Sequence, residues 1–177
     1  MFSDSLVKIV ESHAEELTRG AVKKLQSNPR TQSYHGLRHD ELYQRVYAVY
    51  HDLGGWLGEK TDDAIQAWYN ELGEERFREG IPLVEVLWAL VLTKYHLRDY
   101  ISTSGLANSA MELYRQQEID RLIGQFFDRA VCYAAEGYQR EASRHEDDAL
   151  TNAPKRRGRA AGRPSCHDAP GVPIPVV

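Results

Sequence analysis

Apolar residues recur at spacings of three and four from the N-terminus to about residue 145, which predicts amphipathic helices. No stretch shows the alternation of apolar and polar residues that is typical of a half-buried strand. The pattern divides into five segments, roughly 3–28, 40–58, 61–80, 82–102 and 109–144. We therefore expect an all-α single domain of five helices, arranged either as a bundle or in a globin-like way.

Several residues mark where these helices begin and end. Thr61 can cap the third helix with its side-chain oxygen. Gly80 suits a helix C-terminus that needs a positive φ, and Pro82 suits the first position of the next helix. Ser109 and Glu112 have the spacing of a capping box at the start of the fifth helix. We expect a tight corner at 79–82 and a helix of about 35 residues at the end of the domain.

The fifth helix has more apolar positions than one contact surface needs. They are Ile119, Leu122, Ile123, Phe126, Phe127, Ala130, Val131, Ala134 and Tyr138. We expect a homodimer in which Ile123, Phe127, Val131 and Tyr138 face a second copy. The alternative is a more enclosed bundle, in which the first and fourth helices cover both sides of this helix.

The second helix carries two stripes side by side, one aliphatic and one of tyrosines. The tyrosine stripe, formed by Tyr43, Tyr47 and Tyr50, either packs on a second neighbour or lines a pocket. A sensor would need such a pocket between the second and fourth helices. Its candidate lining residues are Tyr47, Arg76, Trp88, Tyr95 and His96.

Few residues point to chemistry. His96 has the side chain of a haem ligand, phospho-acceptor or general base, but no second ligand or paired base accompanies it. His35 and His39 have a spacing that suits a metal on a helix, but Gly36 lies between them. His145 and the glutamate after it resemble a phospho-accepting dipeptide without an ATP-binding domain. We expect no enzyme, no catalytic residue, no metal site and no cofactor.

Arg76 and Arg78 lie among three glutamates. Either one arginine clamps an anion inside a pocket, or both belong to a salt-bridged helix face. Cys132 falls on the apolar side of the fifth helix, and we expect it to be a buried thiol. The two cysteines do not indicate a disulfide framework.

Charge is distributed unevenly. The net charge of the 177 residues is −4, and residues 153–177 contain five Lys or Arg and one Asp, so the rest carries −8. An acidic body argues against nucleic-acid binding. The basic tail is rich in Pro and Gly, so we expect a domain at 1–148 and a disordered tail at 149–177. The longest apolar run, 86–92, is too short to span a membrane, and we expect a cytoplasmic protein.

Three segments together resemble a known bacterial family. They are SYHGLRHDELYQRVYAVYHDLGGWL (33–57), LGEERFREGIPLVEVLWALVLTKYHLRDYI (72–101) and ELYRQQEIDRLIGQFFDRAVCYAAEGYQ (112–139). They are similar to the N-terminal domain of RsbT co-antagonist proteins of the RsbRD type, and similar domains precede sensor histidine kinases.

The resemblance implies a sensory or regulatory module that dimerises and acts through protein partners in stress or two-component-type signalling. Related RsbR-type domains are globin-like without haem. A globin-like sensor of haem or another small molecule, using His96, is the alternative. The family's domains usually lead into an effector, and none follows residue 145 here. We expect a domain that works alone or a remnant of a longer ancestor.

Overall fold

The computed structural model describes residues 4–103 and 110–152, and these form an all-α single domain without a β-strand. The elements follow one another as α1 (Asp4–Ser12), α2 (Ala14–Leu25), the 3₁₀ segment η1 (Gln32–Gly36), α3 (His39–His51), the π-helical turn η2 (Gly55–Glu59), α4 (Asp62–Arg78), α5 (Leu83–Thr103) and α6 (Ala110–Asn152). The prediction of an all-helical domain is confirmed.

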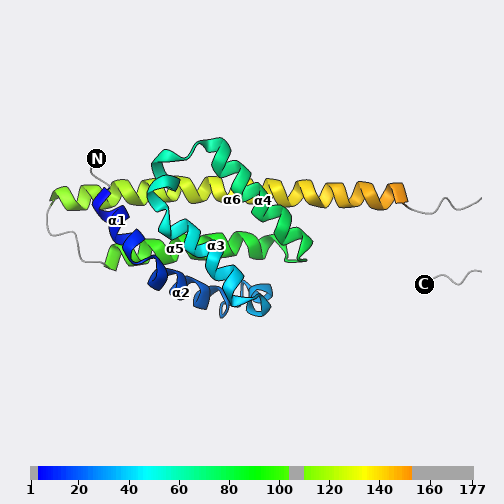
Figure 1. Ribbon diagram of the computed structural model, residues 1–177, viewed down its shortest axis with the longest axis horizontal. Helices are drawn as coiled ribbons and strands as arrows, with labels where there is room; N and C mark the ends of the chain where they lie inside the picture. The colour runs from blue at the N-terminus through cyan, green and yellow to red at the C-terminus, as the bar shows by residue number, and fades with distance from the viewer. Residues whose placement is uncertain (1–3, 104–109, 153–177) are drawn as a thin grey trace, which may run out of the picture.

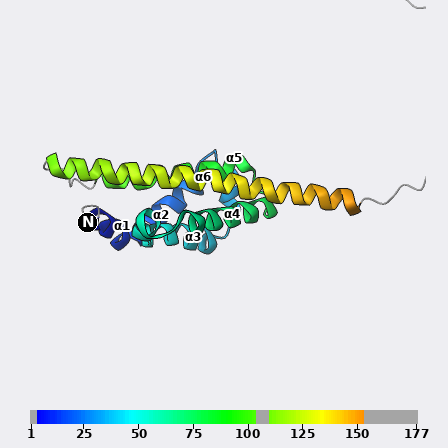
Figure 2. The same ribbon diagram turned by 90° about the horizontal axis from the view of Figure 1, so that it is seen from above.

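α6 is the longest element, and the rest of the domain packs against its middle. α4 crosses it at a slant, and α5 runs alongside it (Figure 1). Seen from above, α1, α2, α3 and α4 form a layer under α5 and α6 (Figure 2). Both ends of α6 extend past this body, and the C-terminal end extends further (Figure 1).

α4 and α6 approach each other closely because glycine lies at the crossing on both helices. A Cβ atom at Gly73 would overlap the backbone of Ala134 and Tyr138. A Cβ atom at Gly137 would overlap the backbone of Asn70 in the same way. Small residues let two helix backbones come together, and here they set the position of α4 on α6.

The corner after α4 has the geometry predicted for it. Gly80 has a φ of 74°, and its amide donates to the Phe77 carbonyl at 2.9 Å. The amide of Ile81 donates to the Arg76 carbonyl at 3.0 Å, which completes a Schellman motif. Tyr138 of α6 donates to the Ile81 carbonyl at 2.9 Å and so ties the corner to the long helix.

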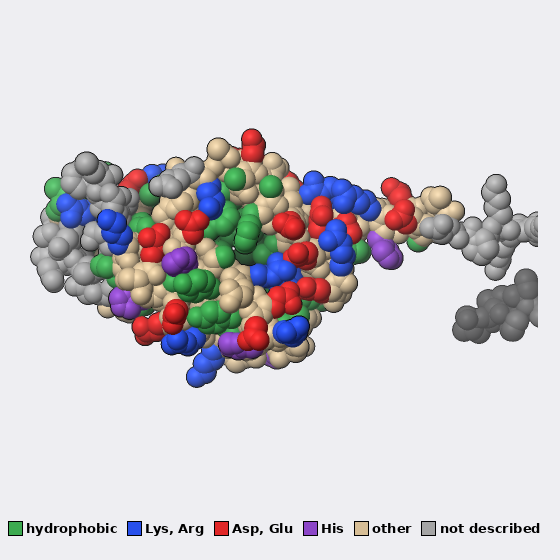
Figure 3. All heavy atoms as spheres, in the orientation of Figure 1, with side chains coloured by type: hydrophobic (Ala, Val, Ile, Leu, Met, Phe, Trp, Pro, Cys, Tyr) green, Lys and Arg blue, Asp and Glu red, His purple; other side chains and the backbone are tan. Residues whose placement is uncertain are grey.

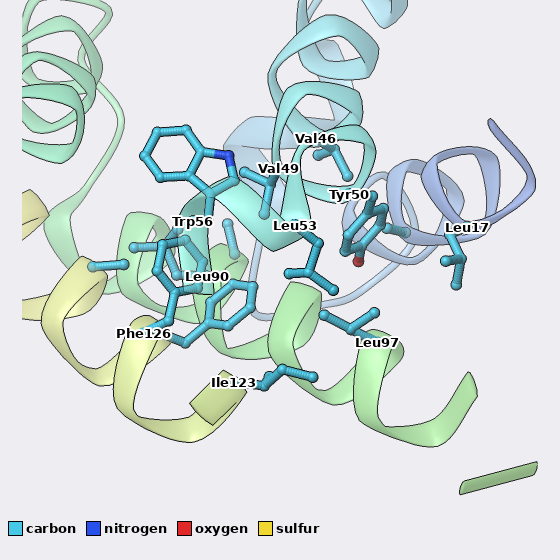
Figure 4. Packing of buried hydrophobic residues seen from close by; sticks show 14 of the residues in the cluster. Leu17, Val46, Val49, Tyr50, Leu53, Trp56, Leu90, Leu97, Ile123 and Phe126 are labelled. Carbon is cyan, nitrogen blue, oxygen red and sulfur yellow. The ribbon is translucent and has the colours of Figure 1, made fainter. Parts of the chain in front are cut away.

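One continuous core connects all layers. The aliphatic stripe predicted on the second helix is buried, and its side chains meet those of α2, α5 and α6 (Figure 4). Trp56, Tyr69 and Phe126 form an aromatic cluster, with ring centroids 5.8 Å apart for each contact to Phe126. This cluster joins η2, α4 and α6.

Two predicted helices are interrupted. The first is divided at His13, where the backbone turns to φ −109° and ψ 16°. At this break, Ser12 and the Nδ1 atom of His13 both bond to the Ile9 carbonyl at 2.9 Å, which also accepts from the His13 amide at 3.2 Å. The predicted helix at 40–58 ends at His51, and a π-helical turn at 55–59 follows it.

The structure also corrects expectations for the last helix. Ile123 and Phe127, expected to face a second copy, are buried within their own chain. The main contacts of α6 are with α4 and α5, the third and fourth predicted helices, whereas the enclosed-bundle alternative named the first and fourth. Val131 and Tyr138 are half-buried against the same core. Cys132, expected to be buried, is exposed.

α6 continues to Asn152, past the predicted boundary at 148. The predicted tail from 153 onward and Ser109 of the capping box lie outside the described residues.

Thr61 does cap α4, since its side chain accepts from the Ala64 amide at 3.3 Å. Among the helices of residues 4–103 and 110–152, none is long and apolar enough to cross a bilayer.

Candidate ligand cavity and its surface entrance

A small interior cavity lies where α3, α4 and α5 meet. It has a volume of about 50 Å³. Residues from five helices and the η1 segment line it: Leu25, Tyr34, Leu42, Arg45, Val46, Val49, Trp68, Tyr69, Leu72, Arg76, Val86, Ala89, Leu90, Thr93 and Phe127. The wall is mostly apolar, with a few polar groups, as is common in binding sites. Its size suits a few waters and is far below the roughly 300–1,000 Å³ of drug-sized sites.

Arg76 is, with Arg45, one of two charged residues in this wall, and only 2% of its surface is exposed. It forms an ion pair with Glu79 one turn later, and its Nη1 atom lies 3.9 Å from Glu41 of α3. The guanidinium also lies over the ring of Tyr34, 5.8 Å from its centroid. Burial raises the pKa of Tyr34 to about 12, although the charge of Arg76 acts in the opposite direction. The arginine is therefore held by partners on α3, α4 and η1.

Tyr69 of α4 and Tyr50 of α3 are both buried, but only one hydroxyl has a partner. Tyr50 donates to the Thr93 carbonyl of α5 at 3.1 Å. The hydroxyl of Tyr69 is inaccessible to solvent and has no hydrogen-bond partner among the described residues. Burial raises the pKa of both tyrosines, so both stay neutral. The core around Tyr69 thus contains an unsatisfied polar group.

A hollow of about 410 Å³ opens at the surface between α3 and α4. It is lined by Glu41, Gln44, Arg45, Trp68, Glu71, Leu72 and Glu75. Arg45, Trp68 and Leu72 also line the interior cavity, so the hollow adjoins the cavity, and we refer to it as the entrance. Figure 3 shows this face, where apolar side chains gather in the middle beside charged ones of both signs.

Arg45 spans the entrance from α3. Its guanidinium pairs with Glu75 of α4 and lies 3.4 Å from Glu41 one turn earlier. Trp68 stands at the rim with 39% of its surface exposed, and its ring meets Trp56 edge-on at 5.4 Å. The entrance therefore combines an ion pair that links two helices with an exposed aromatic face.

Of the five residues predicted to line a ligand pocket, only Arg76 lines this cavity. Tyr47 lies on the outer face of α3, stacked between Tyr43 and His51 with ring centroids 6.0 and 4.9 Å away. Trp88 packs under the guanidinium of Arg30, 4.0 Å from the ring centroid. Both rings therefore pack against side chains outside the cavity and do not line it.

Tyr95 and His96 also lie on other faces of α5. Tyr95 is half-exposed near the middle of the helix. The Nε2 atom of His96 lies 3.1 Å from the Leu17 carbonyl of α2, and Gly20 leaves space for the ring. Burial and then the charge of Lys24 lower the pKa of His96. We interpret His96 as a neutral donor that ties α5 to α2.

Helical geometry explains these errors. On α5 the cavity is lined by Val86, Ala89, Leu90 and Thr93, which share one face at spacings of three and four. Each step along the sequence turns by about 100° around the helix, so Trp88, one residue before Ala89, and Tyr95, two residues after Thr93, leave that face. Tyr34, Arg45, Trp68 and Tyr69 were missed. Tyr34 stands alone in a polar loop, and no periodic pattern could place it.

The other candidate residues do not converge on a site. The Nε2 atom of His35 lies 3.0 Å from the Asn28 carbonyl, and His39 stacks on Tyr43. Arg78 pairs with Glu74 and Glu141, as expected for a salt-bridged helix face. His145 meets Phe77 edge-on at 6.0 Å. In the part of the chain that the structure describes, no group of three or more His, Cys, Asp or Glu side chains is placed to hold a metal.

A second hollow lies between the end of α5 and the start of α6. It has a volume of about 500 Å³ and includes Tyr95, Ile101 and Leu113 in its wall. Tyr95 and Leu113 are about half-exposed, and the neighbouring Met111 and Tyr114 are more exposed still. Arg98 and Asp120 form a bidentate ion pair across this hollow, with a distance of 2.7 Å for one of its two bonds. We call Tyr95, Met111, Leu113 and Tyr114 the α5–α6 apolar face.

Comparison with known protein families identifies the family of this chain. The family model for the RsbT co-antagonist protein RsbRD N-terminal domain matches residues 14–151, which is most of the chain. No curated protein matches the chain, and no solved structure matches it either. The matched range includes the interior cavity, its entrance and the α5–α6 apolar face.

Proposed function

The chain belongs to the RsbRD N-terminal domain family of RsbT co-antagonist proteins, a family of regulatory and sensory domains of stress signalling, and we propose that it works as a homodimeric, non-catalytic sensor domain. In this proposal, two copies pair, the interior cavity receives a signal, and α6 carries the change to a protein partner in the cytoplasm. The proposal that the domain senses a signal rests on one observation, the buried cavity with the entrance beside it at the surface.

The α5–α6 apolar face supports the pairing. It exposes four large apolar side chains, including Leu113 at 51% and Tyr114 at 67%. Exposed apolar clusters commonly mark interaction sites, and a symmetric contact with a second copy covers such a cluster on both chains at once. Since Ile123 and Phe127 are buried within the chain, this face replaces them as the dimer surface in our proposal.

The length of α6 supports the output step. The helix packs on α4 and α5 in its middle and continues past the body with exposed residues from about 143 to 149. A rigid helix transmits a displacement along its axis, so a shift of α4 on α6 would reach this end. A haem sensor using His96 finds no support in this geometry, because the Nε2 atom of His96 lies against the Leu17 carbonyl.

The proposal is tested by the mass of the full chain in solution. Analytical ultracentrifugation at tens of micromolar should give twice the monomer mass for the natural protein. Leu113→Glu should give a monomer with unchanged helix content. Val84→Glu is the matched control, because Val84 is 60% exposed at the opposite end of α5, and it should leave the dimer intact. A natural protein that stays monomeric would contradict the proposal.

A further inference from the structure

α3 and α4 form a helical hairpin whose two ends are held together in different ways. The two helices run in opposite directions on either side of η2 (Figure 1). At the η2 end, the ring of Trp56 meets those of Trp68 and Tyr69 of α4, with centroids 5.4 and 6.2 Å away. Trp56 is buried, so apolar packing closes the hairpin at its turn.

The far end of the hairpin is closed by a chain of charged side chains that alternate in sign. Arg45 of α3 pairs with Glu75 of α4 and lies 3.4 Å from Glu41 one turn earlier. Glu41 in turn lies 3.9 Å from Arg76 of α4, which pairs with Glu79. Two links of this chain therefore cross from α3 to α4. We call these five residues the α3–α4 latch.

The latch lies beside both the interior cavity and the entrance. Arg45 and Arg76 line the cavity, and Arg45 lines the entrance as well. The two spaces share Arg45 of α3 with Trp68 and Leu72 of α4, so the side chains between them belong to these two helices. Movement of α4 away from α3 would therefore join the cavity to the entrance.

α4 is attached to α6 more firmly than to α3. The backbones of α4 and α6 lie close together along their crossing, whereas those of α4 and α3 rarely come close in the described part of the chain. Near its start, α4 is tied to α6 by Asp62 and Arg129 at 2.9 Å, and at its end by Arg78 and Glu141 at 2.7 Å. A displacement of α4 is therefore passed to α6, and the boundary that can open is the one with α3.

The latch is weak enough to open in the folded protein. The side chains of Glu75 and Glu41 are 33% and 43% exposed, and water solvates such charges once they separate, so each pair contributes little. Arg76 is buried, but its partner Glu79 lies on the same helix and moves with it. A folded protein opens locally where its contacts are weakest, and here that is the far end of the hairpin.

We propose that the α3–α4 latch is a gate: its links hold the cavity closed, and their separation moves α4 away from α3 about η2 and displaces α6. The inference deepens the proposed sensory function by naming the part that regulates access to the cavity. It rests on that function for the consequence of opening, but the opening step itself depends only on the latch.

The test measures how fast a thiol in the cavity wall reacts with Ellman's reagent in the full chain, with Cys132 and Cys166 replaced by serine. Ala89→Cys places this thiol at a buried position of the wall. Arg45→Gln removes the central cation of the latch and should speed the reaction at position 89 by about twofold to fivefold. Exchanging the charges, Arg45→Glu with Glu75→Arg, sets two glutamates of α3 against two arginines of α4 and should restore the slow rate.

Two controls separate opening of the latch from a general loss of structure. Ala130→Cys places the thiol in the buried face of α6, outside the cavity wall, and Arg45→Gln should leave its reaction rate unchanged. Arg78→Gln removes ion pairs with Glu74 and Glu141 in place of the latch and should leave the rate at position 89 unchanged.

Three results would overturn the inference. They are a rate at position 89 that Arg45→Gln leaves unchanged, an equal acceleration at positions 89 and 130, and a charge exchange that reacts as fast as Arg45→Gln. Self-association is measured on the same samples. A dimer without the acceleration overturns the gate alone, whereas a monomer that shows it overturns the proposed dimeric function alone.

Discussion

Tyr50 and Tyr69 show that the contribution of a buried tyrosine hydroxyl to stability depends on whether it has a hydrogen-bond partner. Both rings are buried in the same core, but only the hydroxyl of Tyr50 has an acceptor, the Thr93 carbonyl. Removing a satisfied hydroxyl loses a hydrogen bond, whereas removing an unsatisfied one relieves a desolvation penalty. The two tyrosines therefore form a matched pair for mutation.

We predict opposite effects for the two substitutions. Tyr50→Phe should lower the free energy of unfolding by about 1 kcal/mol, and Tyr69→Phe should leave it unchanged or raise it by a similar amount. Urea denaturation followed by circular dichroism measures both. A loss of stability in Tyr69→Phe equal to that in Tyr50→Phe would mean that a bound water or ligand already satisfies the Tyr69 hydroxyl.

His96 gives the domain a specific pH dependence. Its pKa is lowered, first by burial and then by Lys24, while the bond to the Leu17 carbonyl and the charge of Asp99 act against this. The unfolded chain therefore binds more protons than the folded one at pH values between the two pKa values. It follows that the contribution of His96 is complete above its unfolded pKa of about 6.5 and falls as the pH drops below it.

The variant His96→Gln tests this pH dependence, because glutamine keeps a donor for the Leu17 carbonyl and has no charge to gain. Between pH 7 and 5, the natural protein should lose more unfolding free energy than the variant. Thermal unfolding at several pH values gives the comparison. Parallel curves for the two proteins would show that His96 is not the group responsible.

At the scale of elements, the α4–α6 crossing depends on residues that have no side chain. Gly73 and Gly137 allow backbone contact, while Gly124 lies elsewhere on α6 with open space around it. Alanine is favoured over glycine in a helix by about 0.5–1 kcal/mol. The same substitution can therefore stabilise or destabilise α6, and its surroundings decide which.

We predict that Gly137→Ala destabilises the domain by about 1–3 kcal/mol, because the added methyl group forces α4 away from α6. Gly124→Ala is the control on the same helix and should stabilise the domain slightly. Chemical denaturation of both variants provides the measurement. Equal effects of the two substitutions would contradict the close backbone contact at Gly137.

The elements that sequence could predict are those with strong local signals. The start of α4 follows from Thr61, and the α4–α5 corner follows from Gly80. The break at His13 coincides with side-chain bonds to the Ile9 carbonyl, which no apolar periodicity reveals. Arg76 was expected in a pocket and is there, but the other lining residues depend on how α3, α4 and α5 rotate against each other. Such rotations are fixed by tertiary packing, so the sequence pattern could not give them.

At the scale of the whole molecule, each of three surfaces performs one step of the function that we propose. The entrance between α3 and α4 receives a ligand, the α5–α6 apolar face holds a second copy, and the end of α6 meets a partner. α4 links the entrance to α6, because it carries Trp68 at the entrance and packs on α6 through Tyr69 and Gly73. A change at the cavity therefore acts on the helix that packs most extensively on α6.

The most direct measurement of the central claim is the distance between two copies of the full chain, each carrying one spin label. With Cys132 and Cys166 replaced by serine, a label is placed either at Met111→Cys in the α5–α6 apolar face or at Val84→Cys on the opposite end of α5. The account predicts a short, well-defined distance between labels at 111 and a clearly longer one at 84. Absence of dipolar coupling at both positions, or a shorter distance at 84 than at 111, would contradict it.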